Sequence, residues 1–162
     1  MEKSVKLLPF ALDGQRYALF LSSVEKAYRA VEITLLPKAP PIVLGIINVR
    51  GRIIPVVDMR KRFGLPEREI WPNDQLVIAR TPNFYVALVA DNVDGVIETD
   101  EQEIIMTDQV LPNTDYVEGV VKLADGLLLI HDLDRFLSLE EEDALMNALQ
   151  KRGATTEEVM VA

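Results

Sequence analysis

The residue best suited to catalysis or metal binding is His131, the single histidine, which is followed by two carboxylates at Asp132 and Asp134. A histidine beside carboxylates could form a metal site or an acid–base pair. The surrounding sequence, Leu127 to Phe136, instead has the pattern of a buried strand followed by a capped turn. No second ligand stands at helical or hairpin spacing, so we predict a structural role for this histidine.

Other chemical signatures are weak. The stretch Asp91-Asn92-Val93-Asp94-Gly95 resembles a calcium loop superficially, but its oxygen ligands do not alternate and no glutamate follows at loop position twelve. No serine lies in a nucleophile elbow and no glycine-rich loop with lysine offers a phosphate cradle. The absence of cysteine excludes thiolate chemistry and cysteine-ligated zinc. We therefore predict a protein that is not an enzyme and has no metal or cofactor.

Five cations fall between positions 50 and 62 of a chain whose formal net charge is -9. They could form a solvated basic face, or they could bind an anion or another small ligand in a β-barrel, which is the alternative function. Arg50 differs from the others because a hairpin tip would hold it out toward a partner. A pI near 4.6 argues against binding to the nucleic-acid backbone. The five cations are Arg50, Arg52, Arg60, Lys61 and Arg62.

The cations lie on a predicted hairpin and short helix, Gly45 to Gly64. Two β-branched runs flank the turn Arg50-Gly51-Arg52, and Gly51 supplies the positive φ that a tight turn requires. Pro55 cannot donate to a ladder, so we expect an edge strand or a bulge there. Asp58 suits the N-cap of a one-turn helix, Met59 to Phe63, which Gly64 closes.

Apolar alternation and turn residues predict that the rest of the chain is mainly β. Asp13-Gly14 and Asp125-Gly126 are the strongest further hairpin turns. Ser22 and Ser23 could cap a short helical turn, and Asp132 could cap another. The expected strands are 6–12, 16–20, 28–33, 75–79, 84–89, 93–98, 117–123 and 127–130; helical turns are expected over 24–27 and after 132, a loop over 110–116, a helix over 140–151 and a frayed tail over 153–162.

Two parts of the chain resemble each other. The glycine hairpins align when Gly45 is matched with Gly119 and Gly51 with Gly126, and Asp58-Met59 then matches Asp132-Leu133. The segment from Tyr17 to Val24 also resembles that from Tyr85 to Val93. Units of roughly 60 to 70 residues are marginal alone, so we predict two small β-barrels that share a hydrophobic core.

Length and composition fit one folded body. The 162 residues are 49% hydrophobic and 27% charged, and the longest apolar run, Ile42 to Val49, is far too short to span a bilayer. The start of the sequence lacks the apolar core of a signal peptide. We expect a cytoplasmic protein.

The central motif is similar to that of the CheW family of chemotaxis coupling proteins. In that family a Gly-φ-φ-Asn-Leu-Arg-Gly segment (φ apolar) precedes an apolar pair, Pro, two apolar residues and Asp-Leu-Arg. Residues 45–51 read Gly-Ile-Ile-Asn-Val-Arg-Gly and residues 53–60 read Ile-Ile-Pro-Val-Val-Asp-Met-Arg. Residues 89–93 and 131–137 resemble the family's second valine-bearing turn and its closing segment.

The resemblance implies an all-β fold of two intertwined five-stranded SH3-like barrels with short helices and a C-terminal helix. We expect a CheW-like domain over 4–139, then a helix and flexible tail over 140–162. The implied function is non-enzymatic: an adaptor that joins the regulatory domain of a CheA-type histidine kinase to the cytoplasmic tips of methyl-accepting receptors. The implied partner-binding residues are Val24, Lys26, Ala27, Gly45, Asn48, Val49, Arg50, Gly51, Asp58, Arg60 and Val93.

One position departs from the family. Its members usually have a glutamate two residues after the valine matching Val24, near the arginine that matches Arg50, whereas this chain has Lys26. A solvated lysine facing an arginine would be repulsive by less than about 1 kcal/mol. Glu25 could compensate, or the partner could differ, as in a chemosensory system other than flagellar chemotaxis.

Overall fold

The computed structural model describes residues 3–29, 32–106 and 116–151. Its elements form two antiparallel-rich sheets, one of seven strands and one of five. Of the loop predicted over 110–116, only residue 116 is described, and the tail predicted over 153–162 lies outside the described residues. The elements are β1 (Ser4–Leu12), β2 (Gln15–Phe20), η1 (Leu21–Ser23), β3 (Val24–Arg29), β4 (Val43–Val49), β5 (Arg52–Val57), α1 (Met59–Phe63), β6 (Gln75–Arg80), β7 (Tyr85–Ala90), β8 (Asn92–Val93), β9 (Ile97–Asp100), η2 (Glu101–Glu103), β10 (Ile104–Met106), β11 (Val117–Leu123), β12 (Gly126–His131) and α3 (Leu139–Lys151).

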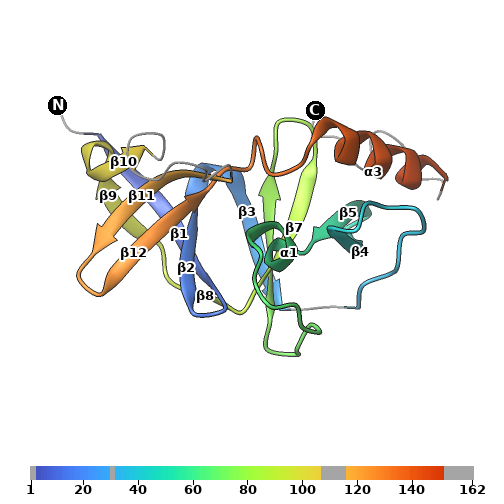
Figure 1. Cartoon of the computed structure of the whole chain (residues 1–162), viewed down its shortest axis with the longest axis horizontal. Coiled ribbons are helices and arrows are strands. Elements are labelled where there is room, and N and C mark those ends of the chain that lie inside the picture. The colour runs from blue at the N-terminus through green and yellow to red at the C-terminus, as the bar shows by residue number, and fades with distance from the viewer. Residues whose placement is uncertain (1–2, 30–31, 107–115, 152–162) are drawn as a thin grey trace.

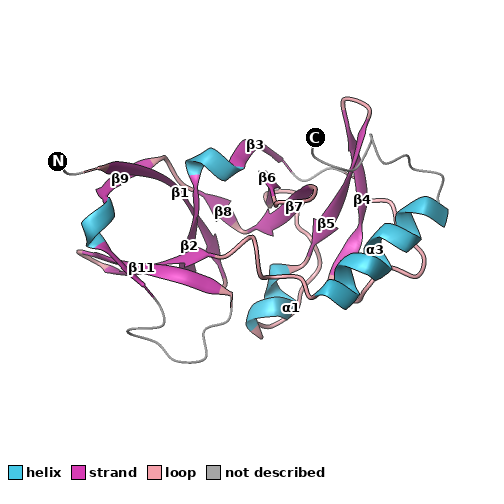
Figure 2. Cartoon of the chain, turned by 90° about the horizontal axis from the view of Figure 1, so that it is seen from above, coloured by secondary structure: helices cyan, strands magenta, loops and turns pink. Residues whose placement is uncertain are grey.

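The chain passes between the sheets and returns. The larger sheet has the order β10-β11-β12-β2-β1-β8, with β9 also paired to β1, and the smaller has the order β3-β6-β7-β5-β4. A backbone bridge between Thr34 and Ile46 connects the segment after β3 to β4, at the other edge of the smaller sheet. Figures 1 and 2 show the two sheets side by side, with α3 beside the smaller one. The intertwined topology is thus confirmed.

Three hydrophobic clusters hold this arrangement. One fills the smaller barrel around Ile54 and Leu76, and another fills the larger around Leu7 and Leu128. The third draws on both sheets and on α3, and buries Phe10 among its largest side chains. The shared core predicted from the sequence is therefore present. Burial of apolar area at ~25 cal/mol per Å² makes such a shared core the main reason the two barrels stay together.

The two glycine hairpins occupy equivalent places. In β4–β5 and β11–β12 alike, the register shifts just before a glycine, Gly45 or Gly119. The backbone N–H of Asp58 donates to Ile42 O at 2.8 Å, and that of Asp132 donates to Tyr116 O at the same distance. The predicted duplication agrees with this geometry.

One part of the predicted alignment was wrong by one residue. The turn of the second hairpin is Ala124–Asp125, because Leu123 pairs with Gly126, so Gly51 corresponds to Asp125. The first hairpin needs glycine because both residues of its turn have positive φ, whereas Asp125 is not in that conformation.

Several local predictions also need correction. Residues 24–27 are strand and not helix, because pairing with β6 satisfies their backbone. Asp132 accepts a hydrogen bond from Asp134 N at 3.0 Å but caps only a turn. The larger sheet has seven strands and not five, because β8 and β9 pair with successive parts of β1 and β10 adds an edge.

Pro55 does not lie in an edge strand. β5 runs between β4 and β7, and the proline is tolerated because β7 pairs only with Val56 and Val57. The register shift of this hairpin lies in β4, next to Gly45, and not at the proline. The predicted ends of α1 are confirmed: Asp58 caps the helix by accepting from Arg60 N at 3.0 Å, and Gly64 ends it with φ +68°. The single strand predicted over 93–98 is wrong, because residues 94–96 separate β8 from β9.

Candidate functional site

The candidate site centres on the tip of the β4–β5 hairpin. Arg50 and Gly51 form its two-residue turn, with φ of 53° and 85°, the combination that a type I′ turn requires. Asn48 supports the turn because its side-chain oxygen accepts a hydrogen bond from Gly51 N at 2.9 Å. Arg50 and Asn48 are both exposed. An arginine held in the left-handed region costs about 1 kcal/mol, so folding alone does not favour arginine at this position.

Two of the other cations near this hairpin are held by side chains of distant segments. Arg52 forms an ion pair with Glu25 in β3, and its guanidinium lies 4.4 Å from the ring centroid of Tyr85. Arg62 donates to Glu141 in α3 at 2.5 Å. Hydrogen bonding to Glu25 raises the pKa of Arg52 further above its ordinary value. These two cations therefore stabilise the fold.

The remaining two cations of the stretch are also engaged. Arg60 donates to both oxygens of Asp91 at 2.7 Å, and Lys61 donates to Pro41 O at 2.9 Å. Among the described residues, Arg50 alone of the five makes no hydrogen bond or ion pair. An anion site built from the whole stretch is therefore not supported, because four of its five cations already have partners.

Strand β3, which carries the predicted partner-binding residues Val24, Lys26 and Ala27, has a bulge at its start. Val24 pairs with Ala79 and Lys26 with Ile78, so Glu25 is the extra residue. Lys26 is exposed and its ammonium lies 5.1 Å from the ring centroid of Tyr28. Among the described residues, Glu25 pairs with Arg52 and not with Arg50, so Glu25 does not compensate the charge of Arg50.

The eleven predicted partner-binding residues divide by exposure. Gly45, Asp58 and Arg60 are buried, so little of their surface is open to a partner. The others are accessible in whole or in part: Lys26, Asn48, Arg50 and Gly51 are exposed, and Val24, Ala27, Val49 and Val93 are half-buried.

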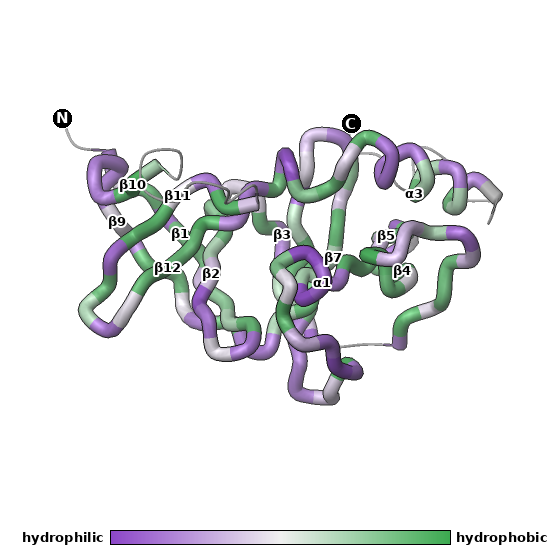
Figure 3. The backbone as a smooth tube through the Cα atoms, in the orientation of Figure 1, coloured by the Kyte–Doolittle hydropathy of each residue, from purple (hydrophilic) through white to green (hydrophobic). Residues whose placement is uncertain are grey.

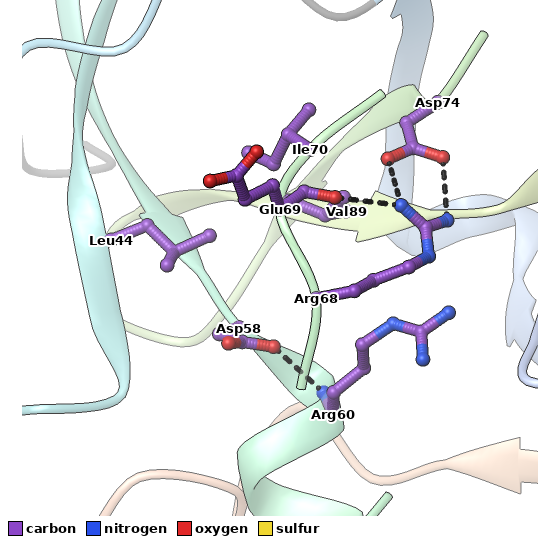
Figure 4. A pocket seen from close by; sticks show the side chains of 8 residues that line it. All are labelled: Leu44, Asp58, Arg60, Arg68, Glu69, Ile70, Asp74 and Val89. Atoms are coloured by element: carbon purple, nitrogen blue, oxygen red, sulfur yellow. Dashed lines mark hydrogen bonds and ion pairs between the residues drawn. The ribbon is translucent and has the colours of Figure 1, made fainter. Parts of the chain in front are cut away.

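A charged network around Arg60 was missed by the sequence reading. Arg68 donates to both oxygens of Asp74 at 2.8 Å and to Asp91 Oδ1 at 2.7 Å, so Asp91 joins Arg60 to Arg68. Figure 4 shows the Arg60 and Arg68 side chains next to each other, with Asp74 beyond Arg68. The void among them measures about 10 Å³, which is room for one water at most.

Asp91 holds this network at the junction of the two sheets. Burial alone would raise the pKa of Asp91, but the hydrogen bonds from Arg60 and from the Asp13 backbone, with the charges of Arg60 and Arg68, lower it below its ordinary value. In the sequence, Asp91 belongs to a stretch that resembles a calcium loop only superficially. Asp91 joins the network only through Arg60 and Arg68, which lie 31 and 23 residues away in the sequence. No residue next to Asp91 indicates these contacts.

His131 is buried, as predicted for a structural residue. Its ring contacts Phe63 and Phe136 edge-on, with centroids 5.5 and 5.4 Å apart. Neither ring nitrogen has a hydrogen-bond partner among the described residues, and burial lowers the pKa of His131 to about 3. The imidazole is therefore neutral and acts as part of an aromatic cluster. Across the described ranges, no group of three or more potential metal-ligating side chains occurs.

Glu118, close to Asp132 and Asp134, should make stability depend on pH. Burial, with the charges of the two aspartates, raises the pKa of Glu118 to about 7. The folded protein then binds a proton more tightly than the unfolded chain, so stability is lost as pH rises from 5 to 8. Since Glu118 is only partly buried, we expect a loss of about 1–2 kcal/mol. Urea melts should show this slope in the wild type and a smaller one in Glu118→Gln.

The fold and the site define a class of protein, a two-barrel binding module. Of the five cations between positions 50 and 62, only Arg50 is unpaired among the described residues, and it lies at an exposed turn. The family model for the CheW-like domain matches residues 6–141. The chain therefore belongs to the CheW-like family and is a non-enzymatic adaptor of chemotaxis signalling.

Individual relatives agree with this assignment. The chain is 32% identical over 141 residues to the chemotaxis protein CheW of Bacillus subtilis, covering 86% of this chain and 90% of the relative. It is 33% identical over 136 residues to CheW of Thermotoga maritima, covering 83% and 89%. The crystal structure of the scaffolding protein TtCheW from Thermoanaerobacter tengcongensis superposes with a TM-score of 0.78 at 32% identity, covering 86% of this chain and 96% of that one. No helix among the described residues is long and apolar enough to cross a membrane.

Proposed function

We propose that this protein joins a CheA-type histidine kinase, through the kinase regulatory domain, to the cytoplasmic tips of methyl-accepting chemoreceptors. It would act in the cytoplasm and reach the membrane through its partners alone. The observation that carries the proposal is the state of Arg50, which is exposed, unpaired among the described residues and held at positive φ. Arginine is common among residues that dominate binding energy, since its planar guanidinium can donate to a carboxylate through two parallel bonds.

The proposed contact surface extends from this turn. Asn48 and Gly51 flank Arg50 at the tip, and the Glu25–Arg52 ion pair links the residue that follows the turn to β3, where Lys26 is exposed. Val49 and Val24 add half-buried apolar area beside these polar groups. Protein–protein interfaces combine apolar area with polar groups and are enriched in arginine, and this surface has both features.

The direct test uses the purified protein with the regulatory domain of the CheA-like kinase, and separately with a receptor tip fragment, both from the same organism. Calorimetry or size exclusion should show a complex with each. If neither the kinase domain nor the receptor fragment binds at concentrations up to those of the cell, the proposal fails.

Arg50→Ala should weaken receptor coupling without unfolding the protein. The side chain makes no described internal contact, so the free energy of unfolding should change by about 0.5 kcal/mol or less. The loss at an interface should exceed about 1.4 kcal/mol, a tenfold rise in Kd. Circular dichroism melts and pull-downs with the receptor fragment measure the two effects.

Two control variants make the Arg50 result specific. Arg50→Asn keeps a residue that tolerates positive φ, which separates the loss of the guanidinium from a change in the turn. Arg135→Ala removes another exposed arginine, in the turn that follows β12 of the larger sheet, and should leave binding unchanged. If Arg50→Ala unfolds the protein instead, Arg50 is structural and the receptor assignment is wrong.

Lys26→Glu should leave the fold intact and strengthen binding to a receptor tip that suits the usual family sequence. The substitution places a carboxylate on an exposed position of β3, where it could orient the Arg50 guanidinium, as the resemblance implies. We expect a twofold to fivefold lower Kd, corresponding to about 0.4–1 kcal/mol for a solvated pair. Weaker binding by Lys26→Glu would show that Lys26 itself meets an acidic partner.

A further inference from the structure

A second recognition site lies away from the hairpin tip. A cleft of about 570 Å³ opens where the β1–β2 turn, the loop between α1 and β6 and the end of β7 come together. Arg60, Arg68 and Asp91 line its floor, while Asp13, Glu67 and Trp71 line its rim. Because the β1–β2 turn belongs to the larger sheet and α1 follows the smaller, a ligand here would contact both halves of the fold. The volume matches a site for a few side chains.

Trp71 is the unusual member of this rim. It is the single tryptophan of the chain, and 58% of it is exposed. Its backbone is fixed, since Trp71 N donates to Asp74 Oδ2 at 2.7 Å and Asp74 N donates to Trp71 O at 3.0 Å. The Arg68 guanidinium lies 4.0 Å from the indole centroid. The ring is thus oriented before any ligand arrives, which lowers the entropy cost of binding.

The charges of the cleft favour a cation. Arg60 and Arg68 are already neutralised by Asp91 and Asp74, so the floor provides no free positive charge for an anion. The side chains of Asp13 and Glu67 are 46% and 63% exposed, and each approaches its nearest cation only to 3.9 and 3.8 Å. Neither accepts a side-chain hydrogen bond from a described residue. Figure 3 shows hydrophilic colour at α1 and in the loop that follows it.

We propose that this cleft docks an arginine or lysine side chain from a basic segment of a partner protein. The cation would lie against the indole of Trp71 and pair with the exposed carboxylates of Asp13 and Glu67, which have only long ion pairs to Arg60 and Lys61. A cation over an indole contributes more than one over the other aromatic rings, and charge complementarity selects basic over acidic partners. The site is separate from the proposed receptor contact at Arg50, with which it shares no exposed residue.

The single tryptophan provides the assay. Titration of the full chain with acetyl-Arg-Arg-Arg-amide at low salt should change the Trp71 fluorescence saturably, and acetyl-Glu-Glu-Glu-amide should not. The double variant Asp13→Asn/Glu67→Gln should raise the Kd for the basic peptide at least fivefold. The double variant Glu98→Gln/Glu103→Gln, which removes two exposed carboxylates elsewhere and gives the same net charge, should leave the Kd within twofold.

Three outcomes would overturn the proposal. Equal loss in both double variants would mean that the peptide responds only to the overall charge of -9. Spermidine binding as tightly as the peptide would assign the cleft to free polyamines, and not to a protein segment. Binding that persists in Trp71→Leu, measured by calorimetry, would place the peptide elsewhere. Because Arg50→Ala should not affect this titration, failure here is distinguishable from failure of the receptor assignment.

Discussion

Asp91→Ala is expected to lower the free energy of unfolding by about 3 kcal/mol, among the largest effects of any single change in the chain. The carboxylate accepts from Arg60 through both oxygens and from Arg68 through one, and its Oδ2 also accepts from Asp13 N at 2.9 Å. Without it, two guanidinium groups would face each other, one of them with a side chain only 9% exposed. Arg68 would keep Asp74, but Arg60 would keep only a 3.9 Å ion pair to Asp13 and a hydrogen bond to Pro66 O, so its buried charge would be poorly compensated.

Asp94→Ala is the matched control, because Asp94 lies three residues after Asp91 but is exposed. Among the described residues, its side chain bonds only to Asn92, at 3.0 Å. It should change stability by about 0.5 kcal/mol or less. Chemical denaturation at pH 7 measures both variants. Similar values for the two would mean that the network contributes little and that Arg60 and Arg68 are adequately solvated.

Gly45→Ala should be the second severe change, at about 3 kcal/mol or more, because overpacking against backbone cannot be relieved by a rotamer change. A Cβ at Gly45 would lie 2.3 Å from Thr34 O and 2.6 Å from Ile33 Cγ2. The same Thr34 carbonyl accepts from Ile46 N at 2.8 Å, so moving it would break the bridge between the segment after β3 and β4. Thermal and denaturant melts should show the loss.

Gly119→Ala tests this explanation, since Gly119 occupies the equivalent place in the other barrel. A Cβ there would meet the Ile104 side chain, with Cγ2 at 2.8 Å, and would lie 3.6 Å from the nearest backbone oxygen, that of Ile105. A side chain can move aside, so we expect a smaller loss of about 1 kcal/mol. Equal losses at both glycines would show that the backbone contact of Gly45 is not what matters.

The sequence predicted the elements whose signals are local. The turn at Arg50-Gly51, the Asp58 cap and the Gly64 stop each depend on neighbouring residues, and all three are present. The duplicated hairpins were detectable because glycine recurs at the two register shifts. The sequence also predicted that the two barrels share one core, because each repeated unit is too small to be stable alone.

The features that the sequence did not reveal depend on distant contacts. Nothing near Arg60 indicates that its partner is Asp91, or that Arg68 joins them. The family motif implied that Gly45, Asp58 and Arg60 bind a partner, but the sequence did not reveal that all three are buried. The helical turn predicted over 24–27 was wrong because pairing with β6 overrode the local capping signal.

The return of the chain to its first sheet affects the order in which the protein can be made. On the ribosome, β3 to β7 emerge as one uninterrupted run, so the smaller sheet can pair completely before the rest of the chain exists. The β1–β2 hairpin must wait, because its neighbours are β8 and β9 on one side and β12, which ends at His131, on the other. During that interval both of its edges are unpaired, and open strand edges are where nascent β-proteins aggregate. The β1–β2 hairpin is therefore made before the smaller sheet but protected after it, and it is where the newborn domain is most exposed to aggregation.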